Sequence, residues 1–145
     1  MLKRKVYQEL LKWKENTEGK ALYIIGARQI GKTTLIREFG KNEYEHFAEI
    51  NFVTDEKAAD IFNDKLTAEA IITNLTAYLQ TPLEPGKTLI LFDEVQECPA
   101  VRSAIKFLVE DGRFDYIESG SLLGVRYKEV RSYPVGFEQI LPMYP

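Results

Sequence analysis

The sequence predicts an α/β fold in which a mostly parallel five-stranded sheet lies between two layers of helices. Short apolar, β-prone runs alternate with segments of helical periodicity along the 145 residues, as they do in chains built from strand–helix–strand units. A glycine-bearing loop follows the first apolar run and opens a helix, and a later apolar run ends in two adjacent carboxylates. In open parallel sheets such polar groups gather at the carboxyl ends of the strands, where ligands bind.

Composition narrows the possible classes of protein. With 45% hydrophobic residues, a chain of this length can bury about two-thirds of its unfolded surface in a single core. The net charge of −3 gives no general footprint for nucleic acid. Polar residues between Gln8 and Lys12 argue against a signal peptide, no apolar run approaches membrane-spanning length, and Cys98 has no second cysteine for a disulfide. We therefore expect a cytoplasmic protein without membrane contacts.

The first elements place a phosphate-binding pattern between a strand and a helix. Leu2 to about Glu15 is predicted to be an amphipathic helix that packs on the sheet, because its apolar residues recur at helical spacing. The apolar run Ala21–Ile25 predicts the first strand. Gly26–Thr33 (Gly-Ala-Arg-Gln-Ile-Gly-Lys-Thr) then fits the Walker A pattern G-x-x-x-x-G-K-[ST]. The next helix is predicted from Lys32 to Phe39, with Gly40 as its stop signal.

This loop has the residue types that binding a nucleotide requires. Gly26 and Gly31 permit backbone angles and a close approach that a Cβ would block, so successive N–H groups can surround a phosphate at the helix N-terminus. Lys32, expected to lie at a solvent-open loop, supplies a charge for the β- and γ-phosphates, and the Thr33 hydroxyl can bind Mg²⁺. Thr34 could reach the α-phosphate. The first helix could also border the base of the nucleotide.

The middle of the chain predicts one strand and two helices. His46–Val53 alternates well enough for a second strand. His46 is the only histidine, and because there is no Cys or His cluster to complete a metal site, we expect a structural or surface role for it. Thr54 is predicted to cap a helix that runs to about Asn63, and a further helix is predicted to begin near Thr67.

A second chemical motif follows. Thr88–Phe92 is a continuous apolar run that predicts a buried strand, and Asp93 and Glu94 come directly after it. This is the Walker B arrangement, in which a strand delivers a carboxylate to the edge beside the phosphate loop. Asp93 would hold Mg²⁺, mostly through water. Glu94 would orient and deprotonate the attacking water.

A fourth strand is predicted after the next helix. Pro99 suits the first position of a helix that ends at Gly112, and Phe114–Ser119 then reads as a strand. The Ser119 hydroxyl at its tip could sense the γ-phosphate. Alternatively, Ser119–Ser121 is a turn whose hydroxyls cap the next segment. Both interpretations remain open.

The rest of the sequence separates the classes of phosphate-loop protein. There is no N-K-x-D guanine motif, and Asp93 is followed by Glu94-Val95-Gln96 rather than by the glycine of a GTPase D-x-x-G. A glutamate directly after the aspartate favours water as the phosphoryl acceptor over the bound substrate of a small-molecule kinase. We therefore predict a P-loop NTPase three-layer sandwich of strand order 5-1-4-3-2, with the fourth strand between the Walker A and Walker B strands. The fifth strand is predicted at Tyr127–Val135, irregular or at an edge because of Pro134.

These motifs resemble a known family. Gly26–Leu35 is similar to the G-x-R-Q-x-G-K-T-T-L loop of a group of bacterial and archaeal AAA-superfamily ATPases, and Asp93–Gln96 is similar to their D-E-[IV]-Q. Glu118–Leu123 resembles their G-S-x-L-L segment. The segments Tyr133–Glu138 and Met143–Pro145 also resemble that group, so the likeness covers essentially the whole chain.

The resemblance implies ATP and Mg²⁺ as cofactors. The implied nucleotide contacts are Gly26, Ala27, Arg28, Gln29, Ile30, Gly31, Lys32, Thr33 and Thr34. The implied metal ligands are Thr33 and Asp93. The implied catalytic residues are Lys32, Glu94 and either Ser119 or Ser121. Family members usually continue into a C-terminal domain, so residues 1–145 are expected to be the N-terminal ATPase domain of a longer protein. Arg126 and Arg131 are candidates for an arginine finger, although each also fits an ordinary surface arginine.

Functions of different classes remain open. The first is Mg²⁺-dependent ATP hydrolysis, slow in isolation because an arginine finger supplied by another subunit could be missing. The alternative is a nucleotide-dependent binding module or switch, in which ATP orders a surface for a protein partner and turnover is incidental. A third option is a DNA-associated ATPase, although the acidic balance gives no indication that this domain grips DNA. The missing C-terminal domain and other subunits are the further partners to consider.

Overall fold

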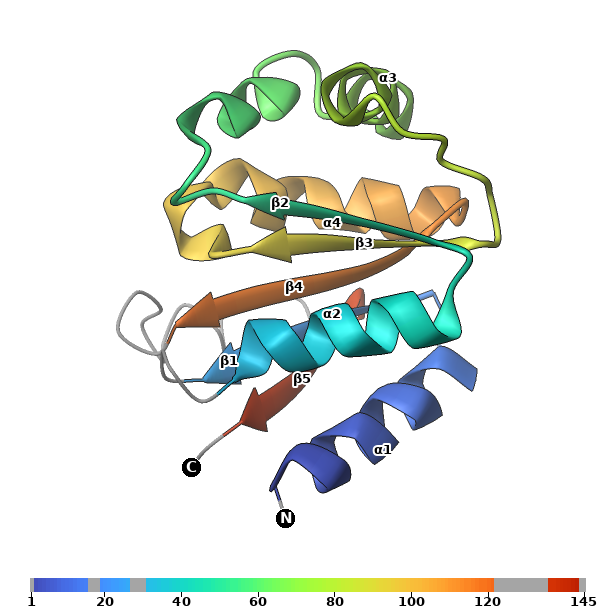
Figure 1. Cartoon of the computed structure of the whole chain (residues 1–145). Coiled ribbons are helices and arrows are strands. Elements are labelled where there is room, and N and C mark those ends of the chain that lie inside the picture. The colour runs from blue at the N-terminus through green and yellow to red at the C-terminus, as the bar shows by residue number, and fades with distance from the viewer. Residues whose placement is uncertain (1, 16–18, 27–30, 122–135, 144–145) are drawn as a thin grey trace.

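The computed structural model describes residues 2–15, 19–26, 31–121 and 136–143. Its five strands form one parallel sheet of order β2-β3-β4-β1-β5, and Figure 1 shows their arrows pointing the same way. The strands are β1 (Ala21–Gly26), β2 (His46–Asn51), β3 (Thr88–Asp93), β4 (Asp115–Ser121) and β5 (Glu138–Met143). The predicted strand order is confirmed, with β4 between β1 and β3.

Helices cover both faces of the sheet (Figure 1). On one face lie α1 (Leu2–Glu15) and α2 (Lys32–Glu43), and on the other lie the 3₁₀ helix η1 (Glu56–Phe62), α3 (Ala68–Leu79) and α4 (Pro99–Asp111). A single 3₁₀ turn, η2 (Val95–Glu97), joins β3 to α4. The predicted three-layer sandwich is therefore confirmed.

Successive side chains of the central strands pack alternately into two hydrophobic cores, one on each face of the sheet. Leu22 and Ile24 of β1 pack with α1 and α2, whereas Tyr23 and Ile25 pack with the opposite layer. Because both faces are covered, β1 and β3 are buried along their whole length, which explains their continuous apolar runs. The Trp13 indole donates a hydrogen bond to the Lys20 carbonyl oxygen at 3.1 Å. This contact helps to fix α1 against the sheet, as the sequence predicted.

The predicted end of α2 at Gly40 is wrong, because the helix continues to Glu43. Gly40 is buried within it, and a Cβ at this position would lie 2.3 Å from Cδ1 of Phe47 in β2. The glycine therefore allows a close approach between helix and strand. Sequence patterns alone do not separate this role from that of a stop signal.

We expect Gly40→Ala to lower the free energy of unfolding by about 1–3 kcal/mol, the usual range for overpacking a core, even though alanine favours helix by about 1 kcal/mol. Denaturant unfolding would measure this change. Gly136→Ala is the matched control, because no atom of the described residues lies within 4 Å of a Cβ there. Equal or higher stability of Gly40→Ala would contradict the close-approach interpretation.

Two helix starts in the middle of the chain differ in outcome. The Thr67 hydroxyl accepts a hydrogen bond from the Ala70 N–H at 3.2 Å and caps α3, so the predicted helix start near Thr67 is confirmed. The predicted cap at Thr54 is wrong: the helix is a 3₁₀ helix whose N-cap position is Asp55. The Thr54 N–H instead donates to the side-chain oxygen of Asn51 at 3.1 Å.

The fifth strand lies later in the chain than predicted. Tyr127–Val135 falls outside the described residues, and the strand in the fifth place is Glu138–Met143, which pairs with β1 alone among the described strands. As an edge strand it accommodates Pro142, which cannot donate to a ladder. Its two polar starting residues and this proline hide the strand from a search for apolar alternation.

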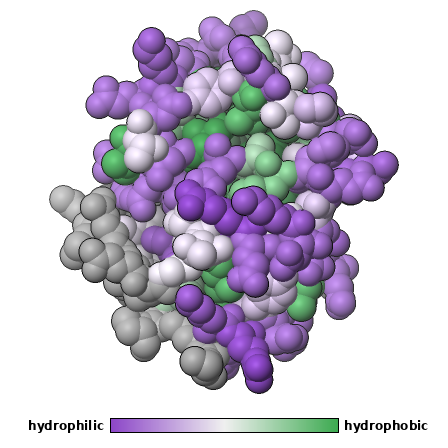
Figure 2. All heavy atoms as spheres, viewed as in Figure 1, coloured by the Kyte–Doolittle hydropathy of each residue, from purple (hydrophilic) through white to green (hydrophobic). Residues whose placement is uncertain are grey.

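The outer surface is largely polar. Hydrophilic side chains cover much of the face seen in Figure 2, with hydrophobic atoms visible mainly between them. Among the described residues, no helix has the length and apolar character needed to cross a membrane.

Candidate nucleotide-binding site

The carboxyl ends of three neighbouring strands meet at one edge of the sheet. Gly26 at the end of β1 is in register with Ser121 of β4, and Asp93 at the end of β3 is in register with Ser119 of β4. Helix α2 starts at the same edge, directly after Gly31, whose φ of 79° lies in the left-handed region. Glycine adopts that conformation without a Cβ clash. The fold therefore brings the start of α2 and the ends of β1, β3 and β4 to one place.

Asp93 is the centre of this arrangement. It is only 2% exposed, and its Oδ1 accepts hydrogen bonds from the Ser119 hydroxyl and, at 3.0 Å, from the Glu94 N–H. Its Oδ2 accepts from the Thr33 hydroxyl at 3.2 Å and from the Asn51 amide at 3.4 Å. The structure thus brings Thr33 and Ser119 to the same carboxylate, as the predicted strand order requires. Asn51 was missed, although it lies near the end of the predicted strand His46–Val53 and is the last residue of β2.

The environment of Asp93 suits a divalent cation. Burial raises the pKa of Asp93, the hydrogen bond from Ser119 lowers it, and the nearby charge of Glu94 raises it further. A bound cation would favour the ionised form and so offset the cost of burial. The Thr33 hydroxyl and the Asp93 carboxylate are oxygen ligands of the kind that Mg²⁺ prefers. The residues present therefore fit the predicted metal.

Lys32 lies inside the site rather than at a solvent-open loop, so that expectation is wrong. It is 5% exposed, and its ammonium donates to the carbonyl oxygens of Gly26 and Gly120 at 3.3 and 3.0 Å. These carbonyls end β1 and β4. The charge is therefore held at the edge where the phosphate loop begins.

Glu94 begins a tight turn next to Asp93. Its backbone is left-handed, with φ 58° and ψ 48°, although it is not a glycine. The Gln96 side-chain amide donates to Glu94 Oε2 at 2.5 Å. Sequence reasoning did not assign a role to Gln96, although it is the last residue of the Asp-Glu-Val-Gln motif.

Other predicted positions have different placements. Thr34 is exposed in the first turn of α2, whereas Ser121 is buried beside Gly26. The predicted phosphate contact of Thr34 stays a prediction. The predicted residues that lie outside the described part of the chain are Ala27, Arg28, Gln29, Ile30, Arg126 and Arg131.

A groove of about 430 Å³ lies between α1 and α2. Its lining includes Lys3 and Tyr7 of α1 and Leu35 of α2. A Cβ built on Gly31 would lie 3.2 Å from Cε of Lys3, so α1 borders the start of α2. The possibility that the first helix contacts the base of a nucleotide stays a prediction, and this proximity supports it.

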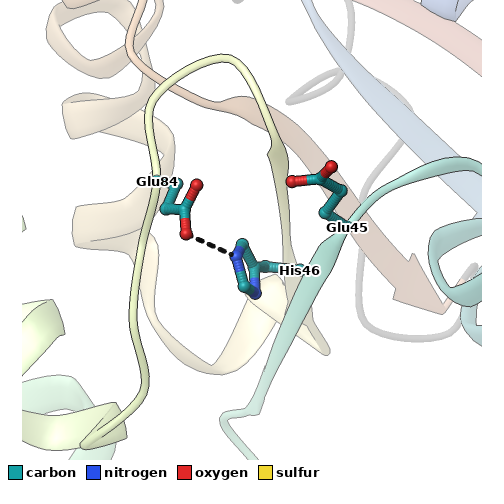
Figure 3. Close-up of side chains that lie close together, drawn as sticks. All are labelled: Glu45, His46 and Glu84. Atoms are coloured by element: carbon teal, nitrogen blue, oxygen red, sulfur yellow. Dashed lines mark ion pairs between the residues drawn. The ribbon is translucent and has the colours of Figure 1, made fainter.

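A group of possible metal ligands lies at the opposite edge of the sheet. Figure 3 shows Glu45, His46 and Glu84 close together, with His46 Nε2 at 3.2 Å from a Glu84 oxygen. The Lys87 ammonium lies 3.5 Å from Glu45 and 3.6 Å from Glu84. The His46 hydrogen bond, with the charges of Lys87 and His46, lowers the pKa of Glu84. This is a surface ion-pair network, consistent with the surface role expected for His46.

Comparisons with known proteins agree with this geometry. No curated protein matches the chain. Among solved structures, it is similar to RuvB from Thermotoga maritima (20% identity, TM-score 0.57), covering 99% of this chain and 45% of that one. It is also similar to PCH-2 of C. elegans, at 13% identity and a TM-score of 0.60, covering 98% of this chain and 42% of that one. A third similar structure is the Pif1 helicase of Candida albicans, at 13% identity and a TM-score of 0.59, covering 99% of this chain and 39% of that one. At these identities the likeness shows the fold.

The chain spans less than half the length of each of these three proteins. The match to a family is stronger, because the AAA domain family matches residues 18–145, most of the chain. Its fold is that of the P-loop nucleotide-binding proteins, and Thr33 and Asp93 meet at one edge of the sheet. The protein therefore belongs to the AAA domain family.

Proposed function

We propose that this AAA domain binds Mg-ATP and hydrolyses it at the edge formed by β1, β3 and β4. One observation carries the proposal: Asp93 accepts hydrogen bonds from Thr33 and Ser119, which the fold brings from α2 and β4. The Walker A threonine and the Walker B aspartate are thus close enough to share one metal ion. A chance match to two separate sequence patterns would not require this convergence.

In this proposal, the residues of the loop bind the phosphates. Lys32 would exchange the carbonyl oxygens of Gly26 and Gly120 for phosphate oxygens, and the N–H groups at the start of α2 would face the same anion. Thr33 and Asp93 would hold Mg²⁺, which supplies positive charge for the phosphate oxygens. Positioning and charge stabilisation are the main ways in which proteins catalyse phosphoryl transfer.

Glu94 would act as the base that orients water toward the γ-phosphate. It adjoins Asp93 in sequence, and its charge is close enough to raise the pKa of that residue. Ser119 of β4, hydrogen-bonded to Asp93, would sense whether the γ-phosphate is present. Turnover is expected to be slow if another subunit supplies the arginine finger, which can contribute roughly 10³- to 10⁵-fold in rate.

Lys32→Met tests the binding half of the proposal. This change removes the charge but keeps most of the buried side-chain stem. Hydrogen bonds to charged groups contribute about 1.5–3 kcal/mol, so we expect the affinity for Mg-ATP to fall by roughly 10- to 100-fold. Titration calorimetry would measure the affinity. Lys41→Met, on the exposed surface of the same helix, is the matched control.

Two results would change the assignment. Unchanged ATP affinity in folded Lys32→Met would contradict the proposed phosphate site. Tight binding by the wild-type chain without phosphate release, with or without added partner subunits, would favour the alternative of a nucleotide-dependent binding module or switch. Release of phosphate that depends on Mg²⁺ would support hydrolysis.

A further inference from the structure

We propose that Gln96 is a positioning residue that fixes the Glu94 carboxylate for its work on water. This inference rests on the proposed hydrolytic function. It adds a residue that acts through Glu94, from the η2 turn that directly follows β3.

The contact is short and has a defined polarity. Nε2 of Gln96 donates to Oε2 of Glu94 at 2.5 Å. An ionised carboxylate can only accept hydrogen bonds, so the amide must present its N–H group rather than its oxygen. A hydrogen bond to an ionised group is stronger than one between neutral groups. Gln96 therefore holds one Glu94 oxygen and restricts rotation of the carboxylate.

The turn that carries Gln96 is well anchored. Val95 and Cys98, on either side of it, are 1% and 4% exposed. The N–H groups of Glu97 and Cys98 donate to the carbonyl oxygens of Glu94 and Val95 at 3.1 and 3.0 Å. Helix α4 starts at the next residue, Pro99. The backbone of Gln96 is consequently fixed relative to Asp93 and the sheet edge.

The same amide offers a second group. The side-chain oxygen of Gln96 is buried and has no hydrogen-bond partner among the described residues. Buried polar groups usually have a partner, often a water molecule. Its burial keeps it out of reach of bulk water, so a water bound between the two side chains would donate one hydrogen bond to Glu94 and its other hydrogen bond to this oxygen. The pair would then orient the water from two sides.

Gln96→Met tests this role, because methionine has a similar length but neither donor nor acceptor. We expect kcat for ATP hydrolysis to fall by roughly 10- to 100-fold, the equivalent of a hydrogen bond to a charged group. The KM for ATP should stay within about twofold, because the contact acts only on the chemical step. Glu97→Ala, an exposed position in the same turn, is the matched control and should retain the wild-type kcat.

A double variant separates positioning from packing. In a Glu94→Gln background, Gln96→Met should cause little further loss of rate, since residues that act as a unit are not additive. An equal fractional loss in both backgrounds would overturn the proposal, as would an unchanged kcat in Gln96→Met.

One measurement does not depend on turnover. The side-chain amide protons of Gln96, assigned in NMR spectra by their absence in Gln96→Met, should shift when Glu94→Ala removes their acceptor. An unchanged signal would overturn the positioning role. A wild-type chain with no hydrolysis would instead overturn the proposed function, and the amide signal would still decide whether Gln96 holds Glu94.

Discussion

Glu94→Gln should lower the rate of ATP hydrolysis by about 10²- to 10⁴-fold, the usual cost of removing a general base, and should leave Mg-ATP binding intact. The expected separation follows from the geometry. Lys32 and Thr33 lie at the start of α2 and would hold the phosphates and the metal. Glu94 instead follows Asp93, the last residue of β3. Glutamine preserves the size of the side chain and removes its capacity to take a proton. Single-turnover phosphate release, alongside calorimetric binding, would measure both quantities.

Asp93→Asn is the informative comparison for this variant. Asp93 is the residue to which Thr33 and Ser119 donate, so its change should weaken the dependence on Mg²⁺ rather than the chemical step alone. Wild-type turnover by Glu94→Gln would mean that the base lies elsewhere or that hydrolysis is not the function. A folded Asp93→Asn with an unaltered Mg²⁺ requirement would remove Asp93 from the metal site.

Arg102→Leu should lower the free energy of unfolding by about 3–5 kcal/mol, the usual cost of leaving a buried charge without its partner. The Arg102 guanidinium lies beneath α4, and its Nη2 donates to Oε1 of Glu138 at 2.8 Å. Its Nε lies 3.5 Å from Oε1 of Glu118. Its Cζ lies over the Tyr23 ring, 4.2 Å from the ring centroid. Glu118 and Glu138 are 0% and 4% exposed. Leucine would leave both carboxyl groups buried without a cation.

Glu118→Gln is the matched variant and should be well tolerated. Burial, together with the hydrogen bond and charge of Glu138, raises the pKa of Glu118 well above its usual range, so folding favours the protonated form of this carboxyl group, which glutamine mimics. Because the folded state then binds a proton that the unfolded state releases, wild-type stability should decline as pH rises from about 4.5 toward the raised pKa. Denaturant unfolding at several pH values should show this slope in the wild type and a smaller one in Glu118→Gln. A stable Arg102→Leu would contradict the account.

The sequence alone predicted the architecture and the residues of the candidate site. A continuous apolar run such as Thr88–Phe92 indicates a strand that is buried on both faces. The Walker A pattern predicts where a strand ends and a helix begins. The extra glutamate after Asp93 was enough to place β4 between β1 and β3, which the sheet confirms. The helix start near Thr67 was also predicted, and its hydroxyl caps α3.

Only the tertiary structure decided which distant side chains meet. Gly40 approaches Phe47 closely because it has no Cβ, and Asn51 donates a hydrogen bond to Asp93. In both cases the sequence pattern indicates that a segment is buried but does not identify the residues that it contacts. The same is true of the Arg102 cluster with Glu118 and Glu138, which reads in sequence as ordinary surface charge. Strand β5 escaped prediction because an edge strand has one partner and tolerates polar residues and proline. Periodicity records how deeply a residue is buried, whereas the partner of a buried polar group is set by the packing of whole elements.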